Sequence, residues 1–353
     1  MEPVNDFDTR LSGIVDRALW RKTPRHDDLS WLLAATDSDT MAIVSAVSKI
    51  RFRNFSNRVK LNFLLNIKSG LCPEDCRYCS QARGSTAAIP TYPVVDRATF
   101  MSAAQRAREL GASRLCLVAS GHGPTDRELD QVTSAIETIK ASDPDLEICA
   151  CLGILKRGQG ERLRQAGVFA YNHNLNTSEG FYGEVCSTHS FGDRKVTAQD
   201  AQSAGLSLCS GVLVGMGETN GDILAAGYAL RELGPESVPV NFLIPIEGTP
   251  LANRRELTPL RCLRILAAYR CLFPEVELRI AGGREVHLRS LQALGLYLAN
   301  SIFIGDYLTT KGQAALADQE MIADAGLVIE GATLPAVPSL RVAEVRLKQS
   351  AFD

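Results

Sequence analysis

Three cysteines stand close together in Cys72-Pro-Glu-Asp-Cys76-Arg-Tyr-Cys79, with the spacing C-x3-C-x2-C. Thiolates are soft ligands, and three of them this close can converge on one small inorganic centre. A [4Fe–4S] cluster normally takes four cysteines, so three local ligands would leave one iron open to a small molecule. A zinc site is the main alternative, but zinc usually takes spaced pairs of ligands and a fourth that closes a tetrahedron. No nearby residue offers that closure, so we favour an iron–sulfur cluster.

A second set of thiols is spread over segments that read as strands. Cys116 lies in Arg-Leu-Cys-Leu-Val, Cys149 in Leu-Glu-Ile-Cys-Ala-Cys and Cys209 in Leu-Ser-Leu-Cys-Ser-Gly. A buried free cysteine is an ordinary small hydrophobic residue, so each one alone favours a structural role. Arg279, in Leu-Arg-Ile-Ala, is harder to dismiss, because a buried guanidinium needs an anionic partner. Taken together, the four residues favour a second iron–sulfur site, whose thiolates would provide that partner.

Two further segments carry groups that could bind a small polar molecule. The glycines of Gly211-Val-Leu-Val-Gly215-Met-Gly217-Glu218 would let a ligand approach the backbone closely. The amides and imidazole of Tyr171-Asn172-His173-Asn174-Leu175-Asn176 can read a urea, a ribose or an amino acid, although an Asn-rich turn is the alternative. Asn241 interrupts an apolar run and needs a partner, either protein or ligand. His189 could be a base or a ligand, although a single histidine is more often structural.

The composition is that of a globular protein with one large core. The chain has 353 residues, 45% of them hydrophobic, and a formal net charge of -2, which gives no hint of a nucleic-acid or membrane partner. No apolar run is long enough to span a bilayer, and the first residues lack the apolar core of a signal peptide. A cytoplasmic location is therefore expected. Ten cysteines in that compartment indicate metal ligation rather than a disulfide framework.

The hydrophobic pattern predicts an α/β protein. Residues 1–56 show apolar residues at helical spacing and are expected to form a helical extension that caps the closed end of a barrel. From 57 to 325, short apolar runs alternate with amphipathic stretches. Eight strands are predicted, at Asn62–Ile67, Arg114–Ala119, Glu147–Leu152, Val168–Asn172, Ser207–Val214, Val238–Ile244, Glu277–Ala281 and Ser301–Ile304. The helices expected between them include Phe100–Leu110, Asp126–Ala141, Ala198–Ala204, Asp222–Leu233, Pro259–Leu272 and Val286–Ala293. Eight such units indicate a TIM-type (β/α)8 barrel, followed by a surface tail over 326–353.

The motifs together resemble one enzyme family. The C-x3-C-x2-C spacing is the signature of the radical S-adenosylmethionine (SAM) superfamily, and the chain is similar to the biotin synthase family within it. The resemblance runs from about residue 50 to 330 and rests on segments in the family's order: Cys72 to Gln81, Tyr171 to Ser178, Cys209-Ser-Gly, Glu218-Thr, Val238 to Leu243, Gly248 to Leu251, Ala281 to Glu285 and Tyr307 to Thr310.

The resemblance implies a role for each matching residue. The [4Fe–4S] ligands would be Cys72, Cys76 and Cys79, and the auxiliary [2Fe–2S] ligands would be Cys116, Cys149, Cys209 and Arg279. The SAM site would include Tyr78, Asn174, Asn176, Gly215, Gly217 and Glu218. The substrate would contact Asn174, Asn241 and Thr309. Asn176 stands where some members carry Asp beside the ribose, which puts an acidic contact there in doubt. Cys151 would lie on the same strand face as Cys149, and the family motif favours Cys149 as the ligand.

The family's reaction explains why these parts are needed. The resemblance implies a sulfurtransferase that converts dethiobiotin to biotin, the last step of biotin biosynthesis, by inserting sulfur at two unactivated carbons. No side-chain base can deprotonate such C–H bonds, so a radical derived from SAM is required, with sulfur taken from the auxiliary cluster. A flavodoxin or ferredoxin would supply electrons, and a homodimer is expected. The alternatives are another radical SAM barrel, such as a methylornithine synthase or a hydrogenase maturase, or an iron–sulfur carrier without catalysis.

Overall fold

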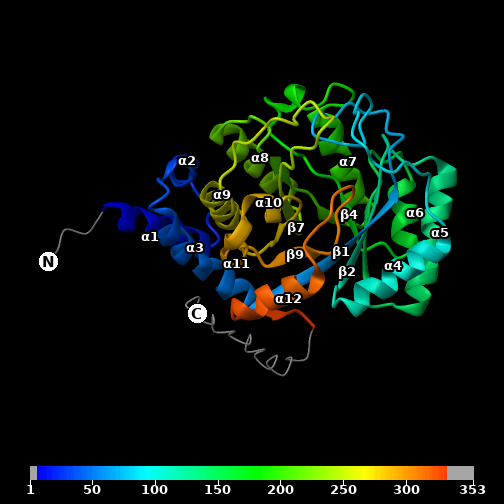
Figure 1. Ribbon diagram of the computed structural model, residues 1–353. Helices are drawn as coiled ribbons and strands as arrows, with labels where there is room; N and C mark the ends of the chain where they lie inside the picture. Colours follow the sequence, from blue (N-terminus) through cyan, green and yellow to red (C-terminus); the bar gives the residue numbers. More distant parts are fainter. Residues whose placement is uncertain (1–5, 332–353) are drawn as a thin grey trace, which may run out of the picture.

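Eight parallel strand positions close into a barrel in the computed structural model, which describes residues 6–331 (Figure 1). The strands are β1 (Arg58–Lys68), β2 (Arg114–Ala119), β3 (Glu147–Cys151), β4 (Ala170–Asn172), β5 (Ser207–Cys209), β6 (Val212–Val214), β7 (Ser237–Phe242), β8 (Glu277–Ile280), β9 (Ser301–Ile304) and β10 (Val328–Ile329). The ring runs β1-β2-β3-β4-β5-β7-β8-β9 and closes where β1 pairs with β9. The predicted TIM-type barrel is confirmed.

Helices form the outer layer of the barrel. They are α4 (Arg97–Glu109), α5 (Asp126–Ser142), α6 (Gln159–Gln165), α7 (Phe191–Ser203), α8 (Asn220–Leu233), α9 (Pro259–Leu272), α10 (Arg284–His287), α11 (Gln292–Gly295) and α12 (Ala315–Asp324), with 3-10 turns η1 (Tyr182–Glu184) and η2 (Arg289–Leu291). The sequence misses α6, a short polar helix. The single helix predicted over Val286–Ala293 is wrong, because α10, η2 and α11 divide that segment.

The fifth barrel position differs from the prediction of one strand over Ser207–Val214. It is split into β5 and β6, and Gly211 stands at the break. A Cβ on Gly211 would lie 1.9 Å from the carbonyl oxygen of Pro239 on β7, so the two backbones meet where only glycine fits. β5 then continues the ladder from β4, while β6 pairs with β7 and its Val212 also forms an isolated parallel bridge with Asn176.

Three helices precede the barrel: α1 (Asp6–Leu19), α2 (His26–Ala34) and α3 (Thr40–Phe55). The predicted helical character of this region is confirmed. The expected cap over the closed end is wrong in position, because α2 packs on α8 and α9 while α1 and α3 pack on α9, in the outer layer (Figure 1). Buried Arg51 joins α3 to the barrel by donating hydrogen bonds to the carbonyls of Leu296 (3.1 Å) and Arg58 (2.7 Å).

The C-terminal prediction needs one correction. Residues 328–329, assigned to a surface tail, form β10, which pairs with Arg58 and Val59 at the start of β1. The rest of the predicted tail, 332–353, lies outside the described residues. Within 6–331, no helix is both long and apolar enough to cross a membrane.

We predict that Gly211→Ala lowers the free energy of unfolding by about 2 kcal/mol or more, because its methyl group would overlap the Pro239 carbonyl. Denaturant unfolding of the cluster-free chain measures this change. Gly13→Ala is the matched control, since a Cβ there meets open space within α1 and should stabilise the helix by about 0.5–1 kcal/mol. Equal stability of Gly211→Ala and the wild type would show that β5 and β6 are not held this closely to β7.

Candidate active site

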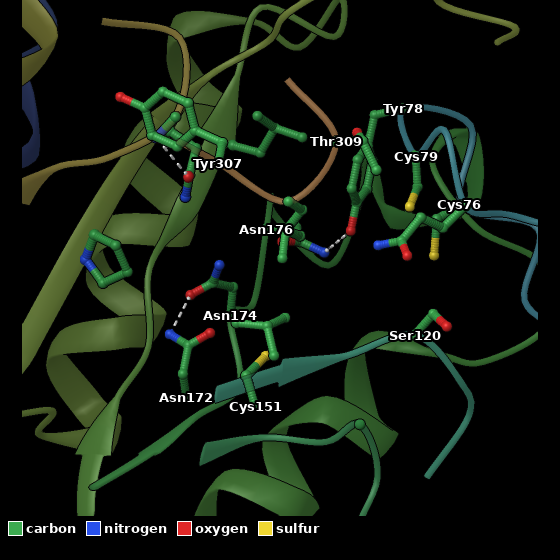
Figure 2. A pocket seen from close by; sticks show the side chains of 18 of the residues that line it. Cys76, Tyr78, Cys79, Ser120, Cys151, Asn172, Asn174, Asn176, Tyr307 and Thr309 are labelled. Carbon is green, nitrogen blue, oxygen red and sulfur yellow. Dashed lines mark hydrogen bonds between the residues drawn. The ribbon is translucent and has the colours of Figure 1, made fainter. Parts of the chain in front are cut away.

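A cavity of about 360 Å³ lies where the strands end, and cysteines from both sets reach it, although Cys209 does not line it. Cys72, Cys76 and Cys79 line it from the loop after β1, while Cys116 and Cys149 line it from within β2 and β3. Figure 2 shows Cys76, Tyr78 and Cys79 on one side of the cavity, and Cys151 with the Asn172 to Asn176 segment on another. The size of this cavity suits a small-molecule ligand rather than a macromolecule.

The loop after β1 carries the first thiols out of the sheet through a tight turn. Gly70 and Leu71 have φ values of 65° and 55°, and the Cys79 backbone nitrogen donates to the Cys76 carbonyl at 3.0 Å. Burial raises the pKa of Cys72 and raises that of Cys79 to about 11, so both thiols are protonated in the free chain. Binding a metal centre here would therefore release protons.

Two acidic residues inside this motif fasten the loop to the segment 182–190. Glu74 accepts from His122 Nδ1 at 2.6 Å and from His189 Nδ1 at 2.5 Å. Asp75 accepts from the backbone nitrogen of Ser187 at 2.9 Å, and hydrogen bonds from Ser187 hold the pKa of Asp75 well below its usual range. No sequence pattern predicts these contacts, because His122 lies 48 residues from Glu74, and Ser187 and His189 lie more than 100 residues from Asp75 and Glu74.

The strand cysteines and Arg279 meet inside the barrel, as predicted. Cys116 stands directly opposite Cys149 in the β2–β3 register, and both belong to one small buried cluster with Cys209 of β5. Arg279 Nη1 lies 3.8 Å from Cys209 Sγ. The hydrogen bond with Cys149, followed by the charge of Arg279, lowers the pKa of Cys209. Three thiols and a guanidinium from four strands thus form one donor set.

The anionic partner of Arg279 differs from the prediction. Its charge is balanced by the carboxylate of Glu277, two residues earlier on β8, at 2.5 Å from Nη2. Glu277 also forms an ion pair with Arg114 at 3.1 Å. The i, i+2 spacing in β8 could have revealed Glu277, because it places both side chains on one strand face. Thiolates are therefore not needed to compensate Arg279, although Cys209 contacts it.

Cys151 and Cys149 occupy different surroundings. Cys151 lines the cavity opposite Val118, and burial raises its pKa to about 12. Cys149, by contrast, interacts with both Cys116 and Cys209. The contacts therefore support Cys149 as the member of the thiol set, with Cys151 nearer the rim of the barrel.

The Asn-rich segment after β4 forms one wall of the cavity. Asn176 donates to the Tyr78 hydroxyl at 3.0 Å, and the Asn174 side-chain oxygen accepts from Asn172 at 3.1 Å and from the Gly211 nitrogen at 3.0 Å (Figure 2). The predicted site residues Tyr78, Asn174 and Asn176 are thus brought together. Buried His173 also lines the cavity, and its Nε2 has no protein partner. Burial lowers the pKa of His173, so its neutral ring can hydrogen-bond a ligand.

Asn241 and Thr309 also line the cavity. The Asn241 amide donates to the Val212 carbonyl at 3.1 Å and accepts from the Gly282 nitrogen at 3.1 Å. The hydrogen-bond partners that the sequence analysis expected for Asn241 are therefore backbone groups of the protein itself. Thr309 and Ser80 share a hydrogen bond of 2.8 Å between their hydroxyls.

The glycine-rich segment after β5 is placed differently from the prediction. Gly215, Gly217 and Glu218 are not among the residues that line the cavity. Glu218 folds back on its own loop and accepts from the Gly215 nitrogen at 2.6 Å. A Cβ on Gly215 would meet Leu257 at 2.7 Å, and one on Gly217 would meet Arg254 at 2.8 Å. These glycines thus admit neighbouring side chains in the wall behind the cavity.

Sequence reasoning missed Arg194 of α7. Its Nη1 donates to the Asn174 carbonyl at 2.9 Å and its Nε to His189 Nε2 at 3.1 Å, and the side chain lines the cavity. Within residues 6–331, no carboxylate forms an ion pair with it. An unbalanced guanidinium at a cavity wall suits an anionic ligand. No local pattern marks this residue, since it follows a loop and its cavity neighbours are distant in sequence.

Comparison with known proteins matches both halves of the barrel to described families. Residues 66–226 match "Radical SAM superfamily", and residues 239–328 match "Biotin and Thiamin Synthesis associated domain". A protein named biotin synthase from Streptomyces avermitilis is 56% identical over 94% of this chain and 85% of its own length. Another from Bacillus licheniformis is 50% identical over 85% of this chain and 90% of its own length.

Solved structures share the fold at low sequence identity. Methylornithine synthase superimposes with a TM-score of 0.77 at 19% identity, over 90% of this chain and 97% of that one. The [FeFe]-hydrogenase maturase from Carboxydothermus hydrogenoformans gives a TM-score of 0.78 at 19% identity, over 92% of this chain and 80% of that one. These likenesses support the barrel architecture alone.

The charge network under the thiols leads to a stability prediction. Glu277→Gln should lower the free energy of unfolding of the cluster-free chain by about 3 kcal/mol near pH 7, because it leaves the buried charges of Arg279 and Arg114 unbalanced. Glu256→Gln, which removes an exposed ion pair with Arg254, is the control and should change stability by less than about 0.5 kcal/mol.

The effect of Glu277→Gln should depend on pH. Burial alone would raise the pKa of Glu277, but the charges of Arg279 and Arg114 hold it well below its usual range. The carboxyl pKa of Glu277 is lower in the folded chain than in the unfolded chain, where it is about 4.3. The ionised carboxylate therefore stabilises the fold at pH values above about 4.3, and this stabilisation is lost as the pH falls below that value toward the folded-state pKa. Denaturant unfolding should therefore show the gap between wild type and variant shrinking in acid. If the difference in free energy of unfolding between wild type and Glu277→Gln stays constant down to pH 3, the role of Glu277 as the counterion of Arg279 and Arg114 would be contradicted.

Proposed function

The chain belongs to the biotin synthase family of radical SAM enzymes, and from that premise we propose which of its residues carry the reaction. It inserts sulfur into dethiobiotin to form biotin, and it uses a [4Fe–4S] cluster and SAM. When bound, this cofactor pair supplies the one-electron chemistry that breaks an unactivated C–H bond. The observation that carries our assignment of residues is that thiols from two separate sets line one cavity, with Cys209 buried next to the two inner thiols that reach it.

Cys72, Cys76 and Cys79 would hold the [4Fe–4S] cluster. Their thiols are free and all border the cavity, which suits soft ligation of a centre that a small molecule can reach. Among the described residues, they do not form a group whose ligand atoms all lie within 4.8 Å of one another. That wider spacing is expected when each cysteine binds a different iron, and it argues against a single ion shared by the three.

SAM would bind between this loop and the segment after β4. Arg194 brings an unbalanced positive charge to the cavity, so it would bind the SAM carboxylate, while Asn174 and Asn176 offer amides for its polar groups. Tyr78, held by Asn176, would lie against the adenine. Gly215, Gly217 and Glu218 would then contribute indirectly, by fixing the conformation of the loop that supports this wall of the cavity.

Cys116, Cys149, Cys209 and Arg279 would hold an auxiliary [2Fe–2S] cluster. The donor set fits such a group, because Cys149 interacts with both Cys116 and Cys209 in one buried cluster, and Arg279 contacts Cys209. Glu277 compensates the charge of Arg279, so this arginine can approach a cluster without a net buried cation. The sulfur source would then lie deeper in the barrel than the loop cysteines.

Dethiobiotin would occupy the cavity between the two thiol sets. Asn174, Asn241 and His173 present amide and imidazole groups suited to a ureido ring, and Thr309 would lie near the carboxylate tail. With substrate bound, the barrel would limit the access of water, so a reactive substrate carbon would meet few other hydrogen donors. Cys151 is one such donor nearby, which makes exact placement of the substrate important.

The remaining assignments rest on the family resemblance. A flavodoxin or ferredoxin would supply electrons, two chains would form a homodimer, and the enzyme would work in the cytoplasm. Residues 1–56 would be the N-terminal helical extension and 57–325 the catalytic barrel, with 326–353 as the tail except where β10 joins the sheet.

Two cysteine variants test the division between the thiol sets. Cys72→Ala should abolish SAM cleavage, because it removes a ligand of the cluster that binds SAM. Cys116→Ala should keep SAM cleavage yet stop biotin formation, because it removes a ligand of the sulfur source alone. Both products can be measured with anaerobically reconstituted protein, reductant and dethiobiotin. Loss of both activities in Cys116→Ala with an intact [4Fe–4S] cluster would contradict the division.

Arg194→Gln should weaken SAM binding by about tenfold to a hundredfold, because a charge-assisted hydrogen bond contributes about 1.5–3 kcal/mol. Equilibrium binding of SAM to the reconstituted enzyme measures the loss. Arg77→Gln is the matched control, since Arg77 is exposed on the cluster loop and pairs with Glu184 at the surface. Equal SAM affinity in Arg194→Gln and the wild type would remove Arg194 from the cofactor site.

A further inference from the structure

Cys186 is a buried thiol that the proposed reaction does not use. It lies between η1 and α7, 110 residues from Cys76, yet the two sulfur atoms are 3.8 Å apart. Buried His189 lies beside it, with Nδ1 at 3.3 Å and Nε2 at 3.8 Å from the Cys186 sulfur. Within residues 6–331, these three form the one group of cysteine, histidine or carboxylate donors whose ligand atoms all lie within 4.8 Å of one another.

These spacings match those of a tetrahedral zinc site. Zinc–sulfur bonds of about 2.3 Å place two sulfur ligands about 3.8 Å apart, and a histidine nitrogen about 3.6 Å from each sulfur. The observed Cys76–Cys186 distance is 3.8 Å, and the His189 nitrogens bracket the second value. Sequence spacing alone pointed away from zinc at Cys72 to Cys79, because no nearby residue completes the ligand set. The fold supplies the missing ligands from the segment after β4.

The surroundings hold the three donors in place without a metal. The Arg77 nitrogen donates to the Val185 carbonyl at 2.9 Å, and the Ser187 nitrogen donates to Asp75 at 2.9 Å, so the two segments are joined on both sides of the group. Glu74 Oε2 lies 2.5 Å from His189 Nδ1. A zinc-binding histidine commonly donates its other ring N–H to a carboxylate, and this leaves Nε2 for the ion.

We propose that the cluster-free chain binds one Zn²⁺ ion through Cys76, Cys186 and His189. Two thiolates balance the charge of the ion and their protons pass to solvent. A water can take the fourth position, as in zinc sites with three protein ligands. The ion replaces Arg194 as the partner of His189 Nε2, and Arg194 keeps its bond to the Asn174 carbonyl.

Zinc and the [4Fe–4S] cluster then exclude one another, because Cys76 cannot bind both. This consequence rests on the proposed assignment of Cys76 to the cluster, whereas the zinc site itself does not. The site therefore belongs to the chain before cluster assembly or after cluster loss. Zinc bound there blocks cluster assembly until it is removed.

Metal titration of the full-length, cluster-free chain tests the site under anaerobic, reducing conditions. Zn²⁺ is titrated against a chromophoric chelator, and Co²⁺ serves as a spectroscopic probe whose charge-transfer bands report the number of thiolate ligands. Cys186→Ser, His189→Ala and Cys76→Ser should each remove one equivalent of tight binding. The affinity at that site should fall more than about a hundredfold, since even changes to residues that only hydrogen-bond a metal ligand cost about 10–100-fold.

Matched variants separate this site from the other thiols. Cys72→Ser and Cys79→Ser remove ligands of the proposed cluster but leave the zinc ligands, so they should keep the equivalent that Cys186→Ser loses. Cys262→Ser, in α9, is a control for removing a buried thiol outside the cavity. Retention of zinc by Cys186→Ser, or its loss from Cys72→Ser and Cys79→Ser instead, would overturn the proposal.

Cluster reconstitution provides the second readout. One equivalent of Zn²⁺ should slow [4Fe–4S] assembly in the wild type and have little effect in Cys186→Ser, whose final cluster content should equal that of the wild type. Equal slowing in both proteins would overturn the competition. If Cys186→Ser assembles less cluster than the wild type in the absence of zinc, Cys186 would be a cluster ligand, and this result would also overturn the proposed competition between zinc and the cluster. Failure of the whole chain to assemble any [4Fe–4S] would count against the proposed function, and the zinc titration would be unaffected.

Discussion

The register of the parallel strands is the constraint on which the inner thiol set depends. Cys116 and Cys149 are direct partners across β2 and β3, and Cys209 meets Ser237 across β5 and β7. Side chains alternate between the two faces of a strand, so a slip of one residue in β3 would turn Cys149 away from the barrel interior. The ladder continues through Asn172 opposite Cys209 and Pro239 opposite Arg279. The donor set is therefore a property of the closed barrel rather than of any one segment.

Charge balance is the second requirement, because four of the strands carry buried or partly buried ionic groups. Arg114 and Arg279 share Glu277, and Lys60 of β1 shares Glu147 with Arg114 at 2.7 and 2.8 Å. Buried charges are stable only when they are paired and hydrogen-bonded. This network lies at the N-terminal side of the thiols along the same strands. The thiol set above it consequently does not have to act as a counterion, and its chemistry is free for ligand binding.

The sequence was a good guide to features that depend on local periodicity. Alternating apolar runs and amphipathic stretches predicted the barrel, and the cysteine spacing predicted the loop after β1 as a cluster site. The break at Gly211 could not be predicted, because it depends on the close approach of Pro239 from another strand. Nor could the packing of α1–α3 beside α9, since an amphipathic pattern does not say which surface it covers.

The site was predictable residue by residue only where a motif marked it. Cys116, Cys149, Cys209 and Arg279 meet as expected, and Asn176 contacts Tyr78. Glu277 was missed although its spacing from Arg279 was a usable signal. Arg194, Glu74 and Cys186 were missed because their partners are far away in sequence. The role of the glycines at 215 and 217 stays a prediction, because a glycine that admits a neighbouring side chain looks the same in sequence as one that admits a ligand.

The central claim is that one chain holds two different iron–sulfur clusters on one cavity. Mössbauer spectra with iron and sulfide analysis of anaerobically reconstituted wild-type protein test it most directly. The account predicts one [4Fe–4S] and one [2Fe–2S] cluster in each chain. A single [4Fe–4S] cluster in fully reconstituted protein would contradict it, and would return Cys116, Cys149 and Cys209 to the role of core residues.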